Sequence, residues 1–247
     1  MNENEFIFEL NKIGISPTKG QLELLKKYYS LLIEWNEKIN LTALTEEKEV
    51  YLKHFYDSLT MNKVIDLNKV DSLCDIGSGA GFPGMVIKIM FPNIKVTLVD
   101  SLNKRVNFLN TVIDSLNLEN IEAIHDRIED YGKKNRDKFS VVTARAVTNL
   151  PVLLEYAMPI TKVGGYFIPL KGSIDEIDSC VNALKVLNTS KVEQCEFFLP
   201  IENSKRIIYK FRRNGFISNK YPRSNAEIKR NSLWLFLFLY FLGNIGF

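Results

Sequence analysis

The sequence has little of what most metal and hydrolytic centres need. Its 247 residues include two histidines and three cysteines. His54 and His125 do not have the spacing of metal ligands, and the sequence contains neither G-x-S-x-G nor a phosphate-binding P-loop. The cysteines (Cys74, Cys180 and Cys195) form no spacing motif, which is typical of reduced cysteines in a cytosolic protein. We therefore expect no metal site and no disulfide framework.

One group of residues imitates a catalytic triad. His54, Asp57 and Ser58 have i, i+3, i+4 spacing, which puts them on one face of a helix. A structural hydrogen-bond cluster is the favoured interpretation.

Targeting and membrane signals are also missing. The first five residues, MNENE, are acidic and do not resemble a signal peptide, so we expect a cytoplasmic protein. Residues 233–242 are ten apolar residues in a row, whereas a bilayer span needs roughly 18. We expect no stable membrane insertion.

The charge is small but unevenly placed. The net charge is +3, yet residues 204–230 hold nine basic residues and one acid. This basic C-terminal edge suggests a docking surface for a polyanion, and the alternative is a solvated strand and tail.

Hydrophobic periodicity divides the chain into a helical part and an alternating part. The first 65 residues predict helices at 3–13, from Ser16-Pro17 onward, and at 46–62, with no strand. Strands and helices then alternate, which predicts a doubly wound, mostly parallel α/β sheet with an N-terminal helical layer. The predicted strands are 70–76, 94–99, 121–125, 139–143 and 165–170, and the helices are 84–91, 103–116, 128–134 and 149–158. A helix at 174–187 then precedes strands at 192–199 and 205–213, which are candidates for an antiparallel edge.

The chain is organised around residues 75–84, where four glycines follow the first predicted strand. Glycine lets the backbone take positive φ and lets a ligand approach closely. Pro83 suits the first turn of the helix that follows. Strand, glycine turn and helix together predict the first βα unit of a nucleotide- or cofactor-binding sheet. Residues 79–84 also satisfy G-x-G-x-x-G, so the glycines alone leave a dinucleotide open.

Two carboxylates favour S-adenosylmethionine over a dinucleotide. Asp75 ends the first predicted strand, where it could bind an ammonium group, and Asp100 ends the second, at the usual distance for a ribose diol. S-adenosylmethionine carries both an amino-acid end and a ribose. The alternative is an ordinary tight turn with capping carboxylates.

Further candidates lie at the carboxyl ends of the other predicted strands. Ile128 and Glu129 are placed to flank an adenine, although Glu129 and Asp130 could instead cap a helix. Four cations are expected to converge on one rim and contact an anion or phosphate: Lys104, Arg127, Arg145 and Lys171.

At this point the motifs resemble a known family. They are Trp35-Asn36…Asn40-Leu41-Thr42, His54…Asp57-Ser58-Leu59, residues 75–84, Leu98-Val99-Asp100-Ser101…Lys104-Arg105, Thr143-Ala144-Arg145-Ala146 and Leu170-Lys171-Gly172. In this order they resemble the bacterial RsmG family, also called glucose-inhibited division protein B, over about residues 5–223. These enzymes use S-adenosylmethionine to methylate guanine N7 in small-subunit ribosomal RNA.

The resemblance implies a fold, a cofactor and a set of site residues. The fold would be a class I (Rossmann-like) S-adenosylmethionine-dependent methyltransferase with a seven-stranded, mostly parallel sheet. An N-terminal helical extension (1–65), a methyltransferase domain (66–223) and a divergent tail (224–247) are expected. The partner would be 16S rRNA or the small ribosomal subunit, and the chain is expected to be monomeric. The implied cofactor-binding residues are Gly77, Phe82, Asp100, Ser101, Leu102, Ile128, Glu129 and Arg145, and the implied substrate-positioning residues are Lys104 and Arg127.

Two hypotheses from other classes remain open. A nicotinamide-dependent oxidoreductase would use the same glycines, but no acid–base pair for hydride transfer is evident. An inactive protein that binds the cofactor and docks on RNA is the other, because residues 229–233 lack the proline expected from the family and lead into the apolar tail. A late reading-frame change is our hypothesis for that tail.

Overall fold

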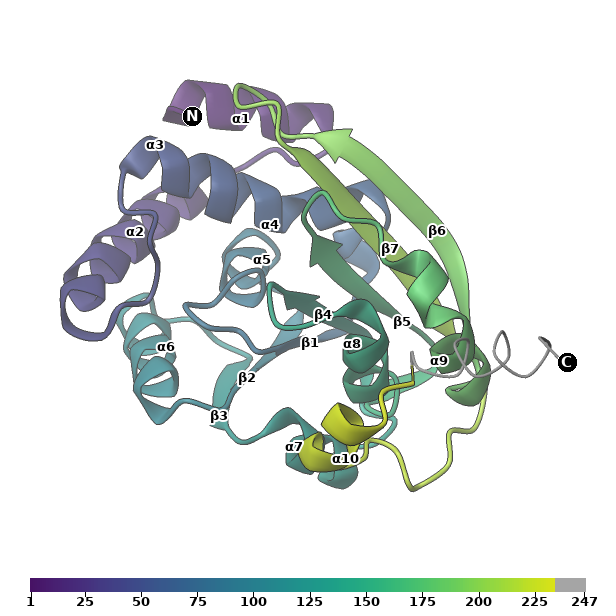
Figure 1. Cartoon of the computed structure of the whole chain (residues 1–247). Coiled ribbons are helices and arrows are strands. Elements are labelled where there is room, and N and C mark those ends of the chain that lie inside the picture. The colour runs from purple at the N-terminus through teal and green to yellow at the C-terminus, as the bar shows by residue number, and fades with distance from the viewer. Residues whose placement is uncertain (234–247) are drawn as a thin grey trace, which may run out of the picture.

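One seven-stranded sheet is the centre of the molecule (Figure 1). The computed structural model describes residues 1–233. The strand order is β3-β2-β1-β4-β5-β7-β6. The strands are β1 (Ser72–Ile76), β2 (Lys95–Asp100), β3 (Ile121–His125), β4 (Phe139–Arg145), β5 (Thr161–Lys171), β6 (Thr189–Phe198) and β7 (Lys205–Arg213). The predicted seven-stranded α/β sheet is thus confirmed.

The predicted antiparallel edge is confirmed, with β7 inside β6. Strand β7 is antiparallel to β5, and β6 is antiparallel to β7, so β7 alone runs against the others. Burial explains the interior place of β7: Ile207, Ile208 and Tyr209 are all fully buried, so both faces of this strand are covered. Strand β6 is largely exposed and takes the edge.

One face of the sheet is covered by two helix layers (Figure 1). Helices α5 (Gly84–Met90) and α6 (Asn103–Ser115) pack on the strands, and α2 (Lys19–Ile39) packs on both helices. Helix α1 (Glu3–Lys12) and a helical run over residues 47–63 complete the outer layer. That run comprises α3 (Glu47–Val50), a π-helical turn (Tyr51–Tyr56), α4 (Asp57–Leu59) and a 3-10 turn (Thr60–Lys63). The N-terminal helices are therefore as predicted.

The other face carries α7 (Ile128–Lys134), α8 (Leu150–Ala157) and α9 (Val181–Val186). Helix α9 and a preceding 3-10 turn (Ile177–Cys180) replace the longer helix predicted at 174–187. The start of that segment is not helical because its acids have other partners. Asp175 accepts a hydrogen bond from Tyr209, and Glu176 accepts one from the backbone N–H of Leu150.

The C-terminal segment returns across α7 and α8 and ends the described chain with α10 (Asn225–Arg230). Arg136 donates to the carbonyl oxygens of Ile217 and Tyr221. Arg223 forms a two-pronged ion pair with Glu155 of α8, with Nε–Oε1 and Nη2–Oε2 distances of 2.8 and 2.6 Å. The Glu155 side chain is 1% exposed, so this pair is the main polar anchor of the segment.

The Glu155–Arg223 pair generates a stability prediction. Glu155→Ala removes the buried carboxylate partner of Arg223, whose Nη1 keeps only the Asn231 carbonyl oxygen, and should lower the free energy of unfolding by about 3–5 kcal/mol in urea titrations. The matched control is Glu34→Ala, which removes the exposed pair with Lys38 and should change it by about 1 kcal/mol or less. Equal effects of the two substitutions would contradict the structural role of the buried pair.

Candidate active site

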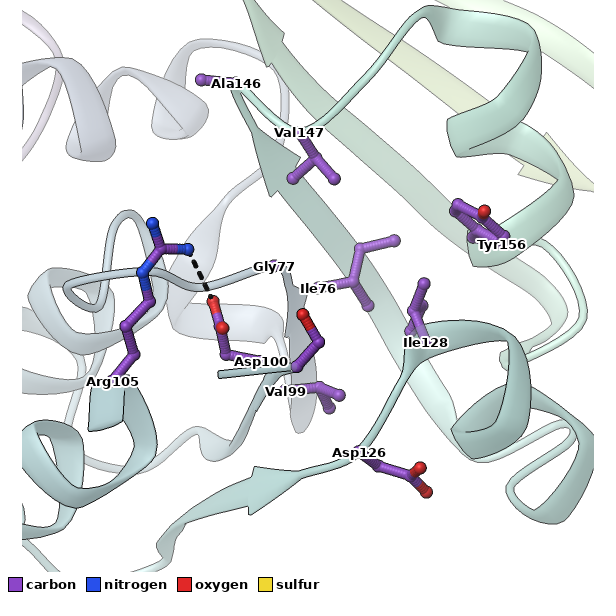
Figure 2. Close-up of a pocket in the computed structure, with 11 residues that line it drawn as sticks. Ile76, Gly77, Val99, Asp100, Arg105, Asp126, Ile128, Ala146, Val147 and Tyr156 are labelled. Carbon is purple, nitrogen blue, oxygen red and sulfur yellow. Dashed lines mark hydrogen bonds and ion pairs between the residues drawn. The ribbon is translucent and has the colours of Figure 1, made fainter. Parts of the chain in front are cut away.

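Two adjoining hollows lie at the carboxyl ends of the parallel strands, where ligands bind in sheets of this kind. The first, of about 230 Å³, is lined by residues that follow β1, β2, β3 and β4 (Figure 2). The second, of about 630 Å³, extends toward α10. The two hollows share the lining residues Ser101, Ile128, Val147 and Tyr156.

The glycine turn forms one wall of the first hollow. Gly77 has φ +71°, and a Cβ atom there would lie 2.6 Å from a methyl group of Val147. Gly84 begins α5, and a Cβ atom there would lie 2.4 Å from Leu98 Cδ2 and 2.9 Å from Asp75 Cβ. Both positions therefore require glycine, one for backbone conformation and close approach and the other for packing.

Asp75 is hydrogen-bonded to the end of this turn. The residue is fully buried, and its Oδ2 accepts a hydrogen bond of 2.9 Å from the backbone N–H of Gly84. Its Oδ1 has no hydrogen-bond partner among the described residues. Burial raises the pKa of this carboxyl to about 7. Asp75 lines neither hollow, so the geometry does not support the expected ammonium contact.

Asp100 stands at the edge of the first hollow, at the end of β2 (Figure 2). Its Oδ2 accepts a hydrogen bond of 2.8 Å from Gly79 N–H, and its Oδ1 accepts one of 2.9 Å from Leu102 N–H. Each carboxylate oxygen has a second lone pair. Asp100 can therefore accept hydrogen bonds from a ligand diol while it holds the glycine turn in place.

Residues after β2 and β3 connect the two hollows. Ser101 and Ile128 line both, whereas Leu102, Arg127 and Glu129 line the second. Glu129 is buried, and its Oε1 lies 4.0 Å from Nη1 of the exposed Arg127. The structure thus brings most of the predicted cofactor residues to one continuous cleft.

Phe82 and Arg145 lie elsewhere. Neither lines a hollow. The Phe82 ring stacks on His54 with centroids 4.3 Å apart, and Arg145 Cζ lies 5.1 Å from its centroid. Arg145 donates to the carbonyl oxygen of Lys53 at 2.8 Å and to Asp57 Oδ2 at 3.2 Å. Both side chains face the helical layer, so the predicted direct cofactor contacts lack geometric support here.

The His54 cluster is structural, as the spacing indicated. Ser58 Oγ donates to the backbone carbonyl of His54 rather than to its ring. The ring hydrogen-bonds to Thr42 Oγ1 at 2.8 Å and to Arg145 Nη2 at 3.0 Å. Burial, followed by the charge of Arg145, lowers the pKa of His54 to about 3. His54 is therefore neutral at physiological pH.

The predicted convergence of four cations on one rim is wrong for two of them. Arg145 is turned to the helical layer, and Lys171 is held by Glu176 at 2.7 Å and by the carbonyl oxygen of Thr148 at 3.1 Å. Lys104 and Arg127 are exposed. Arginine and lysine at strand ends thus divide between internal ion pairs and the surface.

The basic segment at 204–230 is also less free than its composition suggests. Five of its nine cations have internal partners: Lys205 with Glu196, Arg206 with Asp57, Lys210 with the Val64 carbonyl, Arg213 with Asp137 and Arg223 with Glu155. The segment is therefore partly structural, and Lys229 and Arg230 remain exposed on α10.

Three residues that line the first hollow were not predicted from the sequence as ligand contacts. Arg105 faces the first hollow with Nη1 3.5 Å from Asp100 Oδ2, and Val147 and Tyr156 lie on the opposite side (Figure 2). Arg105 follows Asp100 by five residues, in the first turn of α6. That spacing, together with its place in the motif that ends in Lys104-Arg105, could have identified it.

Comparison with known proteins places this arrangement in a family. Residues 21–207 match the family described as rRNA small subunit methyltransferase G. The chain belongs to this family. It is 48% identical to the Ribosomal RNA small subunit methyltransferase G of Exiguobacterium sibiricum, over 94% of this chain and all of the relative. It is also 48% identical to the protein of that name from Bacillus velezensis, over 90% of this chain and 95% of the relative.

Solved structures agree on the fold of this rRNA small subunit methyltransferase G family member. An Aquifex aeolicus protein described as a SAM dependent methyltransferase superposes with a TM-score of 0.51 at 15% identity, over 67% of this chain and 93% of that one. A putative sarcosine dimethylglycine methyltransferase from Galdieria sulphuraria gives 0.53 at 10% identity, over 78% and 98%. The class I methyltransferase fold is thus confirmed.

The glycine turn generates one prediction. Gly77→Ala should destabilise the protein by about 1–2 kcal/mol from positive φ alone, and further through the contact with Val147. Adding Val147→Ala should recover the stability lost through the contact with Val147, but not the stability lost through positive φ. Urea unfolding measures both, with Gly172→Ala as control because no neighbour lies within 4 Å of its added Cβ. A double variant no more stable than Gly77→Ala would contradict the close approach.

His54 generates a pH prediction. The unfolded imidazole binds a proton near pH 6.5, whereas the folded one does so near pH 3. Its contribution to stability is therefore present above pH 6.5 and lost as the pH falls. His54→Gln should lose less stability than the parent between pH 7.5 and 5. An unchanged His54→Gln profile would refute the assignment.

Proposed function

We propose that this protein transfers a methyl group from S-adenosylmethionine to N7 of a specific guanine in 16S rRNA. Family membership supports the reaction, and one observation about this chain carries the proposal: Asp100 and Gly77 line the same hollow at the carboxyl end of the sheet, and Asp100 is hydrogen-bonded to the glycine turn through Gly79 N–H. The Asp100 carboxylate suits a ribose diol, and the glycine turn at Gly77, which lines the same hollow, suits the amino-acid end.

The residues that line the two hollows fit S-adenosylmethionine in three places. Asp100 would hold the ribose, residues 128–129 would contact the adenine, and the turn at Gly77 would accommodate the methionine portion. When bound, S-adenosylmethionine supplies an electrophilic methyl group on a sulfonium. Val147 and Tyr156 also line the hollow.

The acceptor requires orientation rather than deprotonation. Guanine N7 is a major-groove acceptor with a free lone pair at neutral pH. The chain therefore contributes positioning and desolvation, which are strong sources of rate acceleration. N7 gains positive charge as the methyl transfers, so a cation at that atom would be unfavourable. Lys104 and the exposed Arg127 suit phosphate or guanine O6 instead.

We infer that the enzyme acts as a monomer in the cytoplasm, where its ribosomal substrate is found. No helix among residues 1–233 is long and apolar enough to cross a membrane. The apolar tail, with our reading-frame hypothesis for it, lies almost wholly outside the described residues.

Two substitutions separate cofactor binding from substrate positioning. Asp100→Ala should weaken S-adenosylmethionine binding about 10- to 100-fold in calorimetric titrations, because charge-assisted hydrogen bonds are lost. Arg127→Ala should leave that affinity within about twofold but reduce methyl transfer to 16S rRNA about tenfold and flatten its salt dependence. Lys27→Ala, at an exposed position on α2, is the charge-matched control.

The same titration separates the alternatives. NAD should give no binding heat at concentrations that saturate with S-adenosylmethionine. Equal affinity of the parent and Asp100→Ala for S-adenosylmethionine would refute the cofactor assignment. Saturable NAD binding would favour the oxidoreductase, and cofactor binding without methyl transfer would favour an inactive RNA-docking protein.

A further inference from the structure

The second hollow is closed on its outer side by α10. Asn225, Ile228 and Lys229 of this helix line it, opposite Ser101 and Leu102 and beside the start of α7. In Figure 1, α10 lies against the end of the molecule formed by α7 and α8. Residues far apart in the sequence thus line one hollow.

This wall is fixed in place. Ser224 and Glu227 form a reciprocal capping box that begins α10. Arg223, the preceding residue, is held by the buried carboxylate of Glu155. Ile228 is 2% exposed and belongs to the apolar cluster on this face of the sheet. A helix of six residues would not persist without such anchors.

The contents of the hollow indicate which ligand it takes. Ser101 and Ile128 continue the first hollow, which contains the ribose-binding Asp100, into the second. Val147, Val152 and Ile228 supply apolar surface that suits a planar base, and Asn225 and Glu129 supply polar edges. The lining residues also include two cations, Arg127 and Lys229, but both are exposed, whereas Glu129 is buried. A phosphate could pair with these cations at the surface, but deeper in the hollow it would meet the Glu129 carboxylate, which disfavours an RNA backbone there.

We propose that α10 is part of the cofactor site and forms the outer wall of the subsite for the adenine base. This inference rests on the proposed use of S-adenosylmethionine. It assigns a cofactor role to a segment that composition alone marks as an RNA-docking edge. Asn225 is the α10 residue whose enlargement would fill the hollow with least effect on the core, because Ile228 is buried.

The test is Asn225→Trp, titrated calorimetrically with S-adenosylmethionine and with 5′-methylthioadenosine, which has the adenine and ribose but no amino-acid end. We expect both affinities to fall at least tenfold. Arg230→Trp is the matched control, because Arg230 is exposed on the same helix and does not line the hollow. Its affinities should stay within twofold of the parent. Thermal melting confirms that each variant folds, and Lys229→Trp, at an exposed lining position, replaces Asn225→Trp if that variant does not.

Filter binding of 16S rRNA to the same variants tests the alternative that α10 contacts RNA. If the lining variant keeps both nucleoside affinities within twofold and loses RNA affinity, α10 is an RNA contact and the proposal is overturned. Unchanged binding of every ligand also overturns it. If the parent protein itself fails to bind S-adenosylmethionine, the proposed function fails first, and that result is distinct from a failure of the α10 assignment alone.

Discussion

The tight packing of the turn between β1 and α5 is the constraint on which the rest of the structure depends. A Cβ atom at Gly84 would meet Asp75 and Leu98, and one at Gly81 would lie 2.7 Å from the hydroxyl of Tyr28. Tyr28 belongs to α2 and donates to the carbonyl oxygen of Ala80 in the same turn. The sheet, the first covering helix and the outer helical layer therefore meet at one backbone segment. Its position determines where a ligand can lie.

Charged side chains form ion pairs inside the protein as well as on its surface. Asp57 is 5% exposed and accepts hydrogen bonds from Arg145 at the end of β4 and from Arg206 at the start of β7. These bonds attach the helical layer to both halves of the sheet. The two arginines therefore have a structural role. Lys104 and Arg127 are left exposed beside the cleft, which agrees with a site that orients its substrate and needs no general base.

The regular part of this arrangement was predictable because it depends on local pattern. Apolar runs ended by glycine or aspartate located β1 and β2, and Asp100 followed from its place at a strand end. The orientations of the Arg145 and Lys171 side chains were not predictable, because the partners of long side chains depend on the tertiary fold. The place of α10 depends on the contact of Arg223 with Glu155, 68 residues away, and has no local signal.

The central claim is that the cleft beside Asp100 binds S-adenosylmethionine and delivers its methyl group to guanine N7. The most direct measurement is mass mapping of N7-methylguanine in 16S rRNA from cells with and without the gene. The account predicts one N7-methylguanine that disappears with the gene and returns when the intact gene is restored, but not when it carries Asp100→Ala. An unchanged set of N7-methylguanines in cells without the gene would contradict it.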